Sequence, residues 1–240
     1  MKFLCVFAHQ DDEMRCAGTL LRLRKAGHEI AFLTLTAGDK GLPFQSPHGS
    51  TNAAAVRDAE MRAVAKRFES SYACLEREDG FLYDSAELRR DVIATLRRIG
   101  PDVIFTHWTT DYNDDHQVTA KVVTDAALFT TLGSFEVGAP PIRHVPRIWY
   151  VDPGAGYGFE ATHFVELSPS DVTEKASCIR EHVSQMDVMR HLRGRDYADE
   201  VALADSATGA RLMVDYAEGF RPCLAERRIP WPSDLPGQLV

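Results

Sequence analysis

The sequence predicts an α/β fold in which a mostly parallel sheet is covered by helices on both faces. Two kinds of segment, which alternate along the chain, predict it. Short apolar runs rich in β-branched and aromatic residues alternate along the chain with longer segments whose apolar residues recur every three or four positions. Strands that alternate with helices in this way pair in parallel, and the helices then cover both faces of the sheet. With 240 residues and 45% apolar content, we expect one domain over residues 1–240.

The first half of the chain begins this alternation. The apolar run Phe3–Ala8 predicts a strand, and the spacing of Met14, Ala17, Leu20 and Leu21 predicts a helix over Met14–Ala26. The same rules predict strands at Ile30–Thr36 and Tyr72–Leu75 and helices at Ala53–Phe68 and Ala86–Ile99. Between them, the stretch Ala37–Asn52 is a loop long enough to serve as a lid or a binding loop.

The second half continues the pattern, less clearly toward its end. A strand is expected at Asp102–Thr106, a polar loop at His107–Gln117 and a helix at Val118–Phe129. Later expectations are strands at Arg147–Val151 and His163–Leu167, a helix from Ser168 to about Val183 with proline in its first turn, a helix from Tyr197, a strand or helix at Arg211–Tyr216, and an irregular proline-rich tail from about residue 230.

Composition excludes several classes of protein. Acidic residues outnumber basic ones by 35 to 27, and the net charge of −8 disfavours nucleic acid as a partner. No apolar run approaches the ~20 residues that a membrane-spanning helix needs, and the N-terminus does not have the pattern of a signal peptide. Five scattered cysteines without a CxxC pair indicate reduced thiols, as in a cytoplasmic protein.

A dense polar cluster follows the first predicted strand. His9, Asp11, Asp12 and Glu13 bring one imidazole and three carboxylates to the turn between strand and helix. In a parallel sheet this turn lies at the carboxyl edge, where such sheets bind ligands. These residues suit a divalent cation, with one carboxylate left over as a base. Taken singly, the histidine could be a hydrogen-bonded core residue and either aspartate a helix cap.

A second polar cluster, His107–His116, follows another predicted strand. Parallel strands bring their carboxyl ends to one edge, so His9, Asp12 and His116 could converge as two imidazoles and one carboxylate. That set, with an open position, is typical of catalytic zinc. The alternative is a solvated acidic loop in which Asp115 caps a helix. Trp108 and Tyr112 flank this cluster and suit either the face of a sugar or ordinary loop packing.

These clusters belong to a set of motifs that resembles the PIG-L/LmbE-like family of zinc-dependent de-N-acetylases. The first cluster is similar to the family's A-H-P-D-D-E, with Gln10 in place of proline, and Asp111–His116 is similar to its D-x-H-x-D-H, with Asn113 in place of a histidine. Weaker matches are Thr36–Gly41 to T-x-G-x-x-G, Arg57–Glu60 to R-x-x-E, Lys175 with His182–Gln185 to K…H-x-S-Q, and Ala217–Phe220 to A-E-x-F.

The resemblance implies a Rossmann-like, LmbE-like sheet and assigns roles to residues. It implies a Zn²⁺ ion, or another divalent transition metal, held by His9, Asp12 and His116. It makes Asp11 the general base. A carboxylate at Asp115 can orient neighbouring imidazoles and so joins Asp11 in the catalytic group. It places Arg57, Asn113 and Asp111 at the substrate, although asparagine cannot become cationic as the family's histidine can. His48 and His107 are alternatives without a motif, and Lys175, His182 and Gln185 are expected to brace the site.

The function expected from this resemblance is metal-dependent hydrolysis of an N-acetyl group. The substrate would be a 2-acetamido sugar or an N-acetylglucosaminyl glycoside, a small molecule, and assembly into a homo-oligomer stays open. Three alternatives remain: an amidase acting on a thiol–sugar conjugate, a metal-dependent phosphohydrolase, and a sugar-binding scaffold without turnover. Two histidine ligands favour zinc over Mg²⁺, which prefers oxygen.

Overall fold

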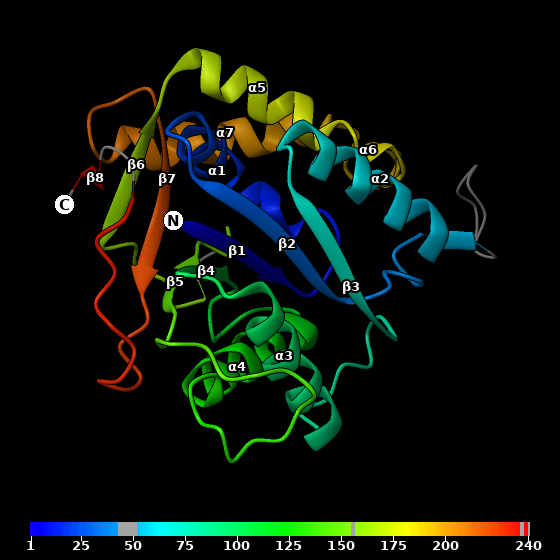
Figure 1. Ribbon diagram of the computed structural model, residues 1–240. Coiled ribbons are helices and arrows are strands. Elements are labelled where there is room, and N and C mark those ends of the chain that lie inside the picture. Colours follow the sequence, from blue (N-terminus) through cyan, green and yellow to red (C-terminus); the bar gives the residue numbers. More distant parts are fainter. Residues whose placement is uncertain (43–51, 155–156, 236–237, 240) are drawn as a thin grey trace.

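One mixed sheet organises the computed structural model, which describes residues 1–42, 52–154, 157–235 and 238–239 (Figure 1). In the described residues the strand order is β3-β2-β1-β4-β5-β7-β6-β8. The strands are β1 (Lys2–Phe7), β2 (Glu29–Thr36), β3 (Ser71–Arg77), β4 (Val103–Thr106), β5 (Arg147–Val151), β6 (His163–Leu167), β7 (Tyr216–Pro222) and β8 (Gln238–Leu239).

The first five strands of that order are parallel, as expected. β1 lies in the middle of this part, with Phe3 opposite Ile30 of β2 and opposite Val103 of β4. β7 then pairs antiparallel with both β5 and β6, and β6 pairs antiparallel with β8. The predicted fold class is therefore confirmed, with an antiparallel extension at one edge.

Helices cover both faces of the sheet because side chains along each strand alternate between the faces. Phe3, Cys5 and Phe7 of β1 pack under the helices above the sheet in Figure 1, whereas Leu4 and Val6 pack against those below it. Above lie α1 (Ala17–Lys25), α2 (Ala53–Arg67), α5 (Pro169–Ile179), α6 (Val183–Arg193) and α7 (Tyr197–Ala210), and below lie α3 (Ala86–Ile99) and α4 (Asp114–Phe129).

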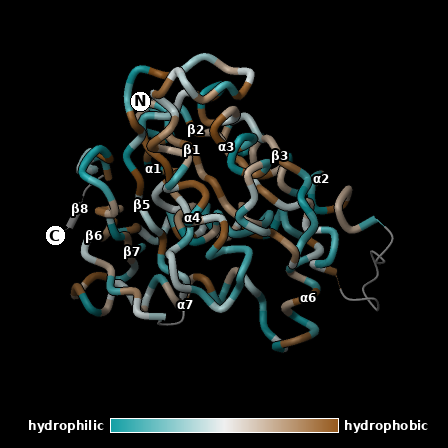
Figure 2. The backbone as a smooth tube through the Cα atoms, turned by 90° about the horizontal axis from the view of Figure 1, so that it is seen from below, coloured by the Kyte–Doolittle hydropathy of each residue, from teal (hydrophilic) through white to brown (hydrophobic). Residues whose placement is uncertain are grey.

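Seen from below, hydrophobic and hydrophilic colours alternate along the helices, as expected for segments with one buried side (Figure 2). No helix of the described ranges is long and apolar enough to cross a membrane.

Two helices begin elsewhere than the apolar spacing predicts. The first begins at Ala17, after a 3-10 turn at Asp12–Arg15. The fourth begins at Asp114 instead of Val118, because the Asn113 side chain accepts the N–H of Asp115 and caps it. The expected loop therefore ends at Asn113, and His116 lies in the first helical turn.

The C-terminal third departs further from the predictions. The helix expected from Ser168 to about Val183 ends at Ile179 as α5. After a break at Arg180–His182, a helix that was not predicted, α6, begins at Val183. The segment after Arg211 is a turn, and the strand begins only at Tyr216. The tail is irregular over 231–235, but it ends in the short strand β8. Of the long loop after β2, residues 43–51, His48 among them, lie outside the described residues.

Candidate metal centre and active site

The two polar clusters meet at the carboxyl edge of the sheet, because β1 and β4 are neighbouring parallel strands. His9 Nδ1 lies 3.3 Å from His116 Nε2 and 3.4 Å from Asp12 Oδ2. His116 Nε2 lies 3.4 Å from Asp12 Oδ1. One ligand atom from each of these residues therefore faces a common point.

These separations fit a tetrahedral metal ion. Zinc–ligand bonds of about 2.0–2.1 Å at tetrahedral angles place neighbouring ligand atoms about 3.3–3.4 Å apart. Burial would raise the pKa of Asp12, but His116 and His107 hold that pKa well below its ordinary value, so the carboxylate is ionised. Two imidazoles and one carboxylate are a donor set suited to zinc.

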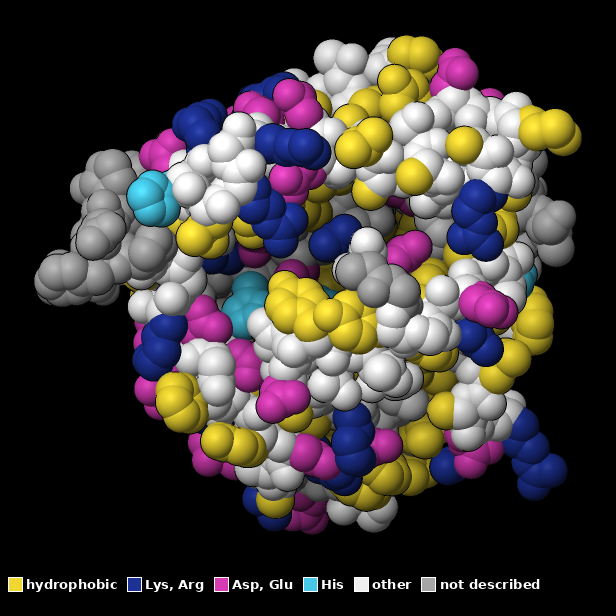
Figure 3. Space-filling model, turned by 180° about the vertical axis from the view of Figure 1, so that it is seen from behind, with side chains coloured by type: hydrophobic (Ala, Val, Ile, Leu, Met, Phe, Trp, Pro, Cys, Tyr) yellow, Lys and Arg dark blue, Asp and Glu magenta, His cyan; other side chains and the backbone are white. Residues whose placement is uncertain are grey.

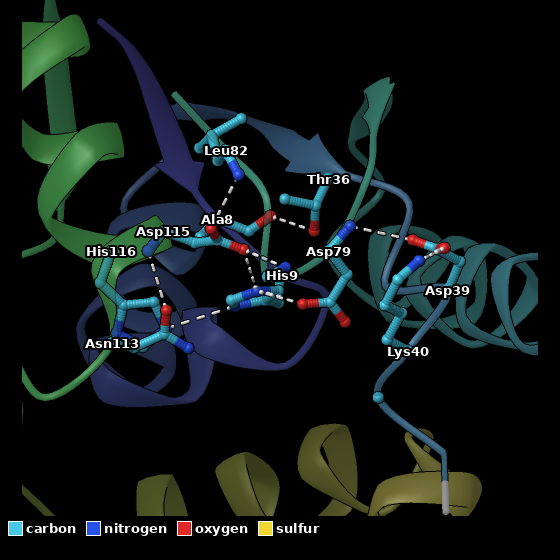
Figure 4. Close-up of polar contacts among 12 residues, drawn as sticks. Ala8, His9, Thr36, Asp39, Lys40, Asp79, Leu82, Asn113, Asp115 and His116 are labelled. Atoms are coloured by element: carbon cyan, nitrogen blue, oxygen red, sulfur yellow. Dashed lines mark hydrogen bonds and ion pairs between the residues drawn. The ribbon is translucent and has the colours of Figure 1, made fainter. Parts of the chain in front are cut away.

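Carboxylates behind His9 fix its orientation. His9 Nε2 lies 3.0 Å from Asp79 Oδ1 and 3.2 Å from Asp115 Oδ2, and both acids point at the ring (Figure 4). Asp115 is itself held, since it accepts the N–H groups of Gly80 at 2.7 Å and Leu82 at 3.0 Å. A proton on Nε2 shared with these carboxylates leaves Nδ1 unprotonated and ready to bind a metal.

His116 is supported in the same way from the other side. Its Nδ1 lies 3.1 Å from Asp111 Oδ2, and the His107 ring stacks on it at 4.0 Å between centroids and 9° between planes. His107 Nε2 accepts the N–H of Ala8 at 2.9 Å, and burial lowers the pKa of His107 to about 4. A neutral His107 whose Nε2 is occupied supports the metal site without being needed as a ligand.

Asp11 stands beside the ligand set in a strained conformation. Its φ is 102°, a left-handed value that costs a non-glycine residue about 1–3 kcal/mol. Arg57 lies 2.7 Å from Asp11 Oδ1 and also donates to the carbonyl of Gln10, and the Asp11 N–H donates to Glu13 Oε2 at 3.0 Å. Burial raises the pKa of Asp11 and Arg57 opposes that shift. The structure therefore presents a basic carboxylate, anchored through one oxygen, next to the metal ligands.

Asn113 turns an amide group toward the same space. Its Oδ1 accepts the N–H of Asp115 at 2.9 Å, which leaves the amide nitrogen as the group that can donate. The backbone N–H of Asn113 donates to Asp111 Oδ1 at 3.1 Å. The cap that starts α4 therefore also orients the side chain at this position.

A cavity of about 200 Å³ opens over these groups. Figure 3 shows it as a hollow in which basic, acidic and histidine side chains come together. It is lined by all of the predicted site residues except Asp115, and by Trp108 and Tyr112. Further lining residues are Arg15, Asp79, His107, Asp152, Gln185 and Tyr197.

Comparison with known proteins identifies the family. The family model of PIG-L, described as GlcNAc-PI de-N-acetylase, matches residues 4–127, more than half of the chain. The chain belongs to the PIG-L family. The matched part contains most of β1, all of β2 to β4 and most of α4, and with them both polar clusters.

Individual relatives extend the likeness to nearly the whole chain. Diacetylchitobiose deacetylase of Thermococcus kodakarensis is 26% identical over 232 residues, which are 92% of this chain and 82% of the relative. The N,N'-diacetylchitobiose deacetylase of Pyrococcus horikoshii shares the fold, with a TM-score of 0.79 and 24% identity over 92% of this chain and 83% of the other. These likenesses agree with the expected enzyme class, a metal-dependent N-deacetylase.

The same fold also carries other chemistry. GalB, the 4-carboxy-2-hydroxymuconate hydratase of Pseudomonas putida KT2440, has a TM-score of 0.79 at 18% identity, over 98% of this chain and 99% of that one. The PIG-L fold is thus shared beyond deacetylases, and the reaction has to be argued from the site.

The segment His182–Gln185 contacts the first polar loop, helix α2 and the loop after β2. His182 Nε2 lies 2.7 Å from Glu13 Oε1, so the buried histidine holds the carboxylate that accepts the N–H of Asp11. Ser184 donates to Glu60 through both its N–H and its hydroxyl, each at 2.7 Å. Gln185 Nε2 donates to the carbonyl of Gly41 at 3.1 Å. His182 and Gln185 thus contact the loops around the site, as expected of bracing residues, whereas Lys175 pairs with Asp205 and Glu218 and does not line this cavity.

Gln10, the departure from the PIG-L proline, ties the metal loop to two strands. Its Nε2 donates to the carbonyl of Thr36 at 3.2 Å and to the hydroxyl of Tyr72 at 3.3 Å. A Cβ at Gly38, whose φ is +63°, would overlap Gln10 Oε1. Side-chain hydrogen bonds thus restrain a position at which proline would fix φ.

Sequence reasoning missed three contributors to the site. Asp79 follows β3 at the same edge of the sheet, and a search for acids after every predicted strand would have found it. The Glu13–His182 pair joins residues 169 positions apart, which no local pattern indicates. Arg15 lies in the 3-10 turn that the sequence analysis assigned to a helix.

Proposed function

We propose that this chain is a zinc-dependent hydrolase that removes the N-acetyl group from a 2-acetamido sugar or an N-acetylglucosaminyl glycoside. The observation that carries the proposal is the convergence of His9, Asp12 and His116 at ligand-atom separations of 3.3–3.4 Å, with Asp11 beside them. Membership of the PIG-L family and the likeness to a diacetylchitobiose deacetylase support an acetylated amino sugar as substrate.

His9, Asp12 and His116 would hold the zinc ion, which would supply Lewis acidity to polarise an acetamide carbonyl and to lower the pKa of a water molecule. Asp11 then acts as the base. Its Oδ1 is anchored by Arg57, and its raised pKa lets it take a proton from the attacking water at the other oxygen. The water oxygen bonds to the carbonyl carbon, the C–N bond breaks, and the proton passes from Asp11 to the leaving nitrogen. The products are acetate and a free amine.

Asn113 is proposed to stabilise the charge that develops on the carbonyl oxygen. Its capping bond fixes the side chain so that the amide nitrogen can donate, and such a donor is worth about 3–4 kcal/mol in a transition state. Arg57 lines the same cavity and adds a positive charge there. Because Arg57 is paired with Asp11, its main role is to position that carboxylate. Asp111 acts on the substrate side through His116 and Asn113, which it holds.

The aromatic pair Trp108 and Tyr112 is proposed to receive the sugar ring. Both line the cavity, and Tyr112 has 66% of its surface exposed while its ring contacts His116 edge-on. Aromatic rings with a polar tip suit the apolar face and hydroxyl edge of a sugar.

The same machinery would also cleave the amide of a thiol–sugar conjugate, and a substrate panel separates the two. We further propose that residues 1–240 work as one domain in the cytoplasm.

The experiment is an assay of acetate and free amine released from a panel of N-acetylglucosamine glycosides. Metal-depleted protein should be inactive, and added Zn²⁺ should restore turnover far better than Mg²⁺. The control for aspartate-to-asparagine substitutions in the site is Asp58→Asn. It changes an aspartate on the exposed side of α2 and should leave turnover unchanged. The proposal fails if no acetylated amino sugar is hydrolysed by zinc-loaded protein, or if metal-depleted protein keeps its activity.

A further inference from the structure

Arg15 lies in the wall of the active-site cavity, and among the described residues it has no counter-ion. It ends the 3-10 turn that starts at the metal ligand Asp12, and it is only partly buried. Within the described ranges, no hydrogen bond or ion pair engages its guanidinium. The other arginine that lines the cavity, Arg57, is already used by Asp11 and by the carbonyl of Gln10.

The backbone beside Arg15 leaves room for its guanidinium. Gly154 has a φ of +86°, and a Cβ at this position would overlap the guanidinium of Arg15. The Asp152 carboxylate, which also lines the cavity, accepts the N–H of Gly154 at 2.7 Å and so holds the turn. The Arg15 guanidinium therefore lies against a turn that only glycine can make there.

Arg15 is not needed as the counter-ion of the buried acids behind it. It also lines a second cavity, of about 230 Å³, together with Lys175, Asp205 and Glu218. There Lys175 lies 2.7 Å from a carboxylate oxygen of each acid. Glu218 also accepts the N–H groups of Gly18 and Thr19. These acids are thus stabilised by their own partners, and Arg15 forms no ion pair with either in the described structure.

Three acids that line the active-site cavity together with Arg15 are also engaged. Asp11 is paired with Arg57, Asp111 with His116, and Asp12 belongs to the metal-ligand set. A guanidinium in the wall of a cavity, with no partner among the described residues, suits a planar or tetrahedral anion, because it offers two parallel N–H donors.

We infer that Arg15 binds an acidic group, a carboxylate or a phosphate, carried by the sugar or by its aglycone. The enzyme would then select acidic N-acetylglucosaminides over neutral ones. This inference rests on the proposed de-N-acetylation. It places the acetamide at the candidate metal ligands and the anion beside Arg15, on the side of the cavity lined by the 3-10 turn and Asp152.

The test compares kcat/KM for three substrates at constant ionic strength. They are a neutral methyl glycoside of N-acetylglucosamine, N-acetylglucosamine 1-phosphate, and an N-acetylglucosamine glycoside with a carboxylate on its aglycone. The wild-type enzyme should prefer at least one acidic substrate tenfold or more, and the two acidic arms show whether phosphate or carboxylate is the preferred source. Arg15→Met should reduce that preference to about one, chiefly through KM, and Arg15→Lys should retain part of it.

The control variant is Arg211→Met, which removes an arginine that lines the second cavity only. It should keep the full preference, and a loss there would move the anion site to the second cavity and overturn the assignment. Equal kcat/KM for neutral and acidic substrates in the wild type would also overturn it, while leaving the deacetylase proposal intact. If Arg15→Met does not fold, the preference of Arg15→Lys for acidic over neutral substrates is the deciding measurement. A reduced preference supports the inference, and an unchanged tenfold preference contradicts it. Failure of all three substrates would contradict the proposed function itself.

Discussion

At the scale of single residues, the site depends on holding Asp11 where a relaxed backbone would not place it. Its left-handed φ is stabilised by the N–H bond to Glu13 and by the Arg57 ion pair. Strain of this kind persists only when surrounding contacts outweigh its cost. The position next to Asp12, a candidate ligand, keeps Asp11 close to the proposed metal centre without making it a ligand.

Asp11→Asn should therefore keep the metal and lose the chemistry. The amide retains the shape of the side chain and its contact with Arg57, but it cannot take a proton. We expect kcat to fall by about 10²–10⁴ while bound zinc stays at the wild-type level. Turnover with measured metal content checks this, and a variant with near wild-type kcat would refute the assignment of the base.

Glu13 is predicted to act through Asp11 as a positioning residue. Glu13→Ala removes the acceptor of the Asp11 N–H, and we expect kcat to fall more than tenfold with little change in KM or metal content. Glu13→Gln should restore most of the rate, because its amide oxygen can accept the same hydrogen bond. A purely structural role for Glu13 would instead lower metal content and thermal stability along with activity, without rescue by glutamine.

At the scale of elements, the start of α4 joins helix capping to catalysis. Asn113→Ala should lower the free energy of unfolding by about 1 kcal/mol through loss of the cap, and should also slow turnover. Asn113→Ser should recover the stability but not the turnover, because a serine cap has no amide nitrogen to donate. Urea unfolding and steady-state kinetics measure the two effects separately, and full recovery of both by serine would argue against an oxyanion role.

Element boundaries also show where sequence reasoning stops. His9, Asp12 and His116 could be predicted because each follows one of two adjacent strands, and parallel strands bring their ends together. Apolar spacing alone predicts that α4 begins at Val118. It does not take into account the capping bond of the Asn113 side chain, which starts the helix at Asp114. The Glu13–His182 pair could not be predicted, since it depends on how α5 and α6 divide and pack against the first loop.

At the scale of the whole molecule, a buried charge cluster joins α5, α7 and β7. Lys175 lies 2.7 Å from oxygens of Asp205 and Glu218, and its side chain is 2% exposed. Lys175→Met leaves two buried carboxylates uncompensated, so we expect a loss of about 3–5 kcal/mol in the free energy of unfolding. Lys121→Met removes an exposed i,i+4 pair and should cost under about 0.5 kcal/mol. Equal effects of the two substitutions in urea unfolding would contradict this account.

The same cluster predicts a dependence of stability on pH. Burial raises the pKa of Asp205 to about 6, against the attraction of Lys175, whereas the ordinary value is 3.8. Between these values the folded protein binds more protons at Asp205 than the unfolded chain does, so this group's contribution to stability falls as pH rises from about 4 to 6. Asp205→Asn should remove that fall. Thermal unfolding of both proteins at pH 4, 5, 6 and 7 checks it, and parallel curves would show that Asp205 does not titrate in this window.

Glu218 accepts the N–H groups of Gly18 and Thr19, and so closes the start of α1 from 200 positions away. A ribosome adds about 5–20 residues per second, so roughly 10–40 s separate the synthesis of Gly18 from that of its acceptor. Until then, the first N–H groups of α1 lack this carboxylate acceptor. The N-terminal end of α1 is therefore completed only once translation has passed β7.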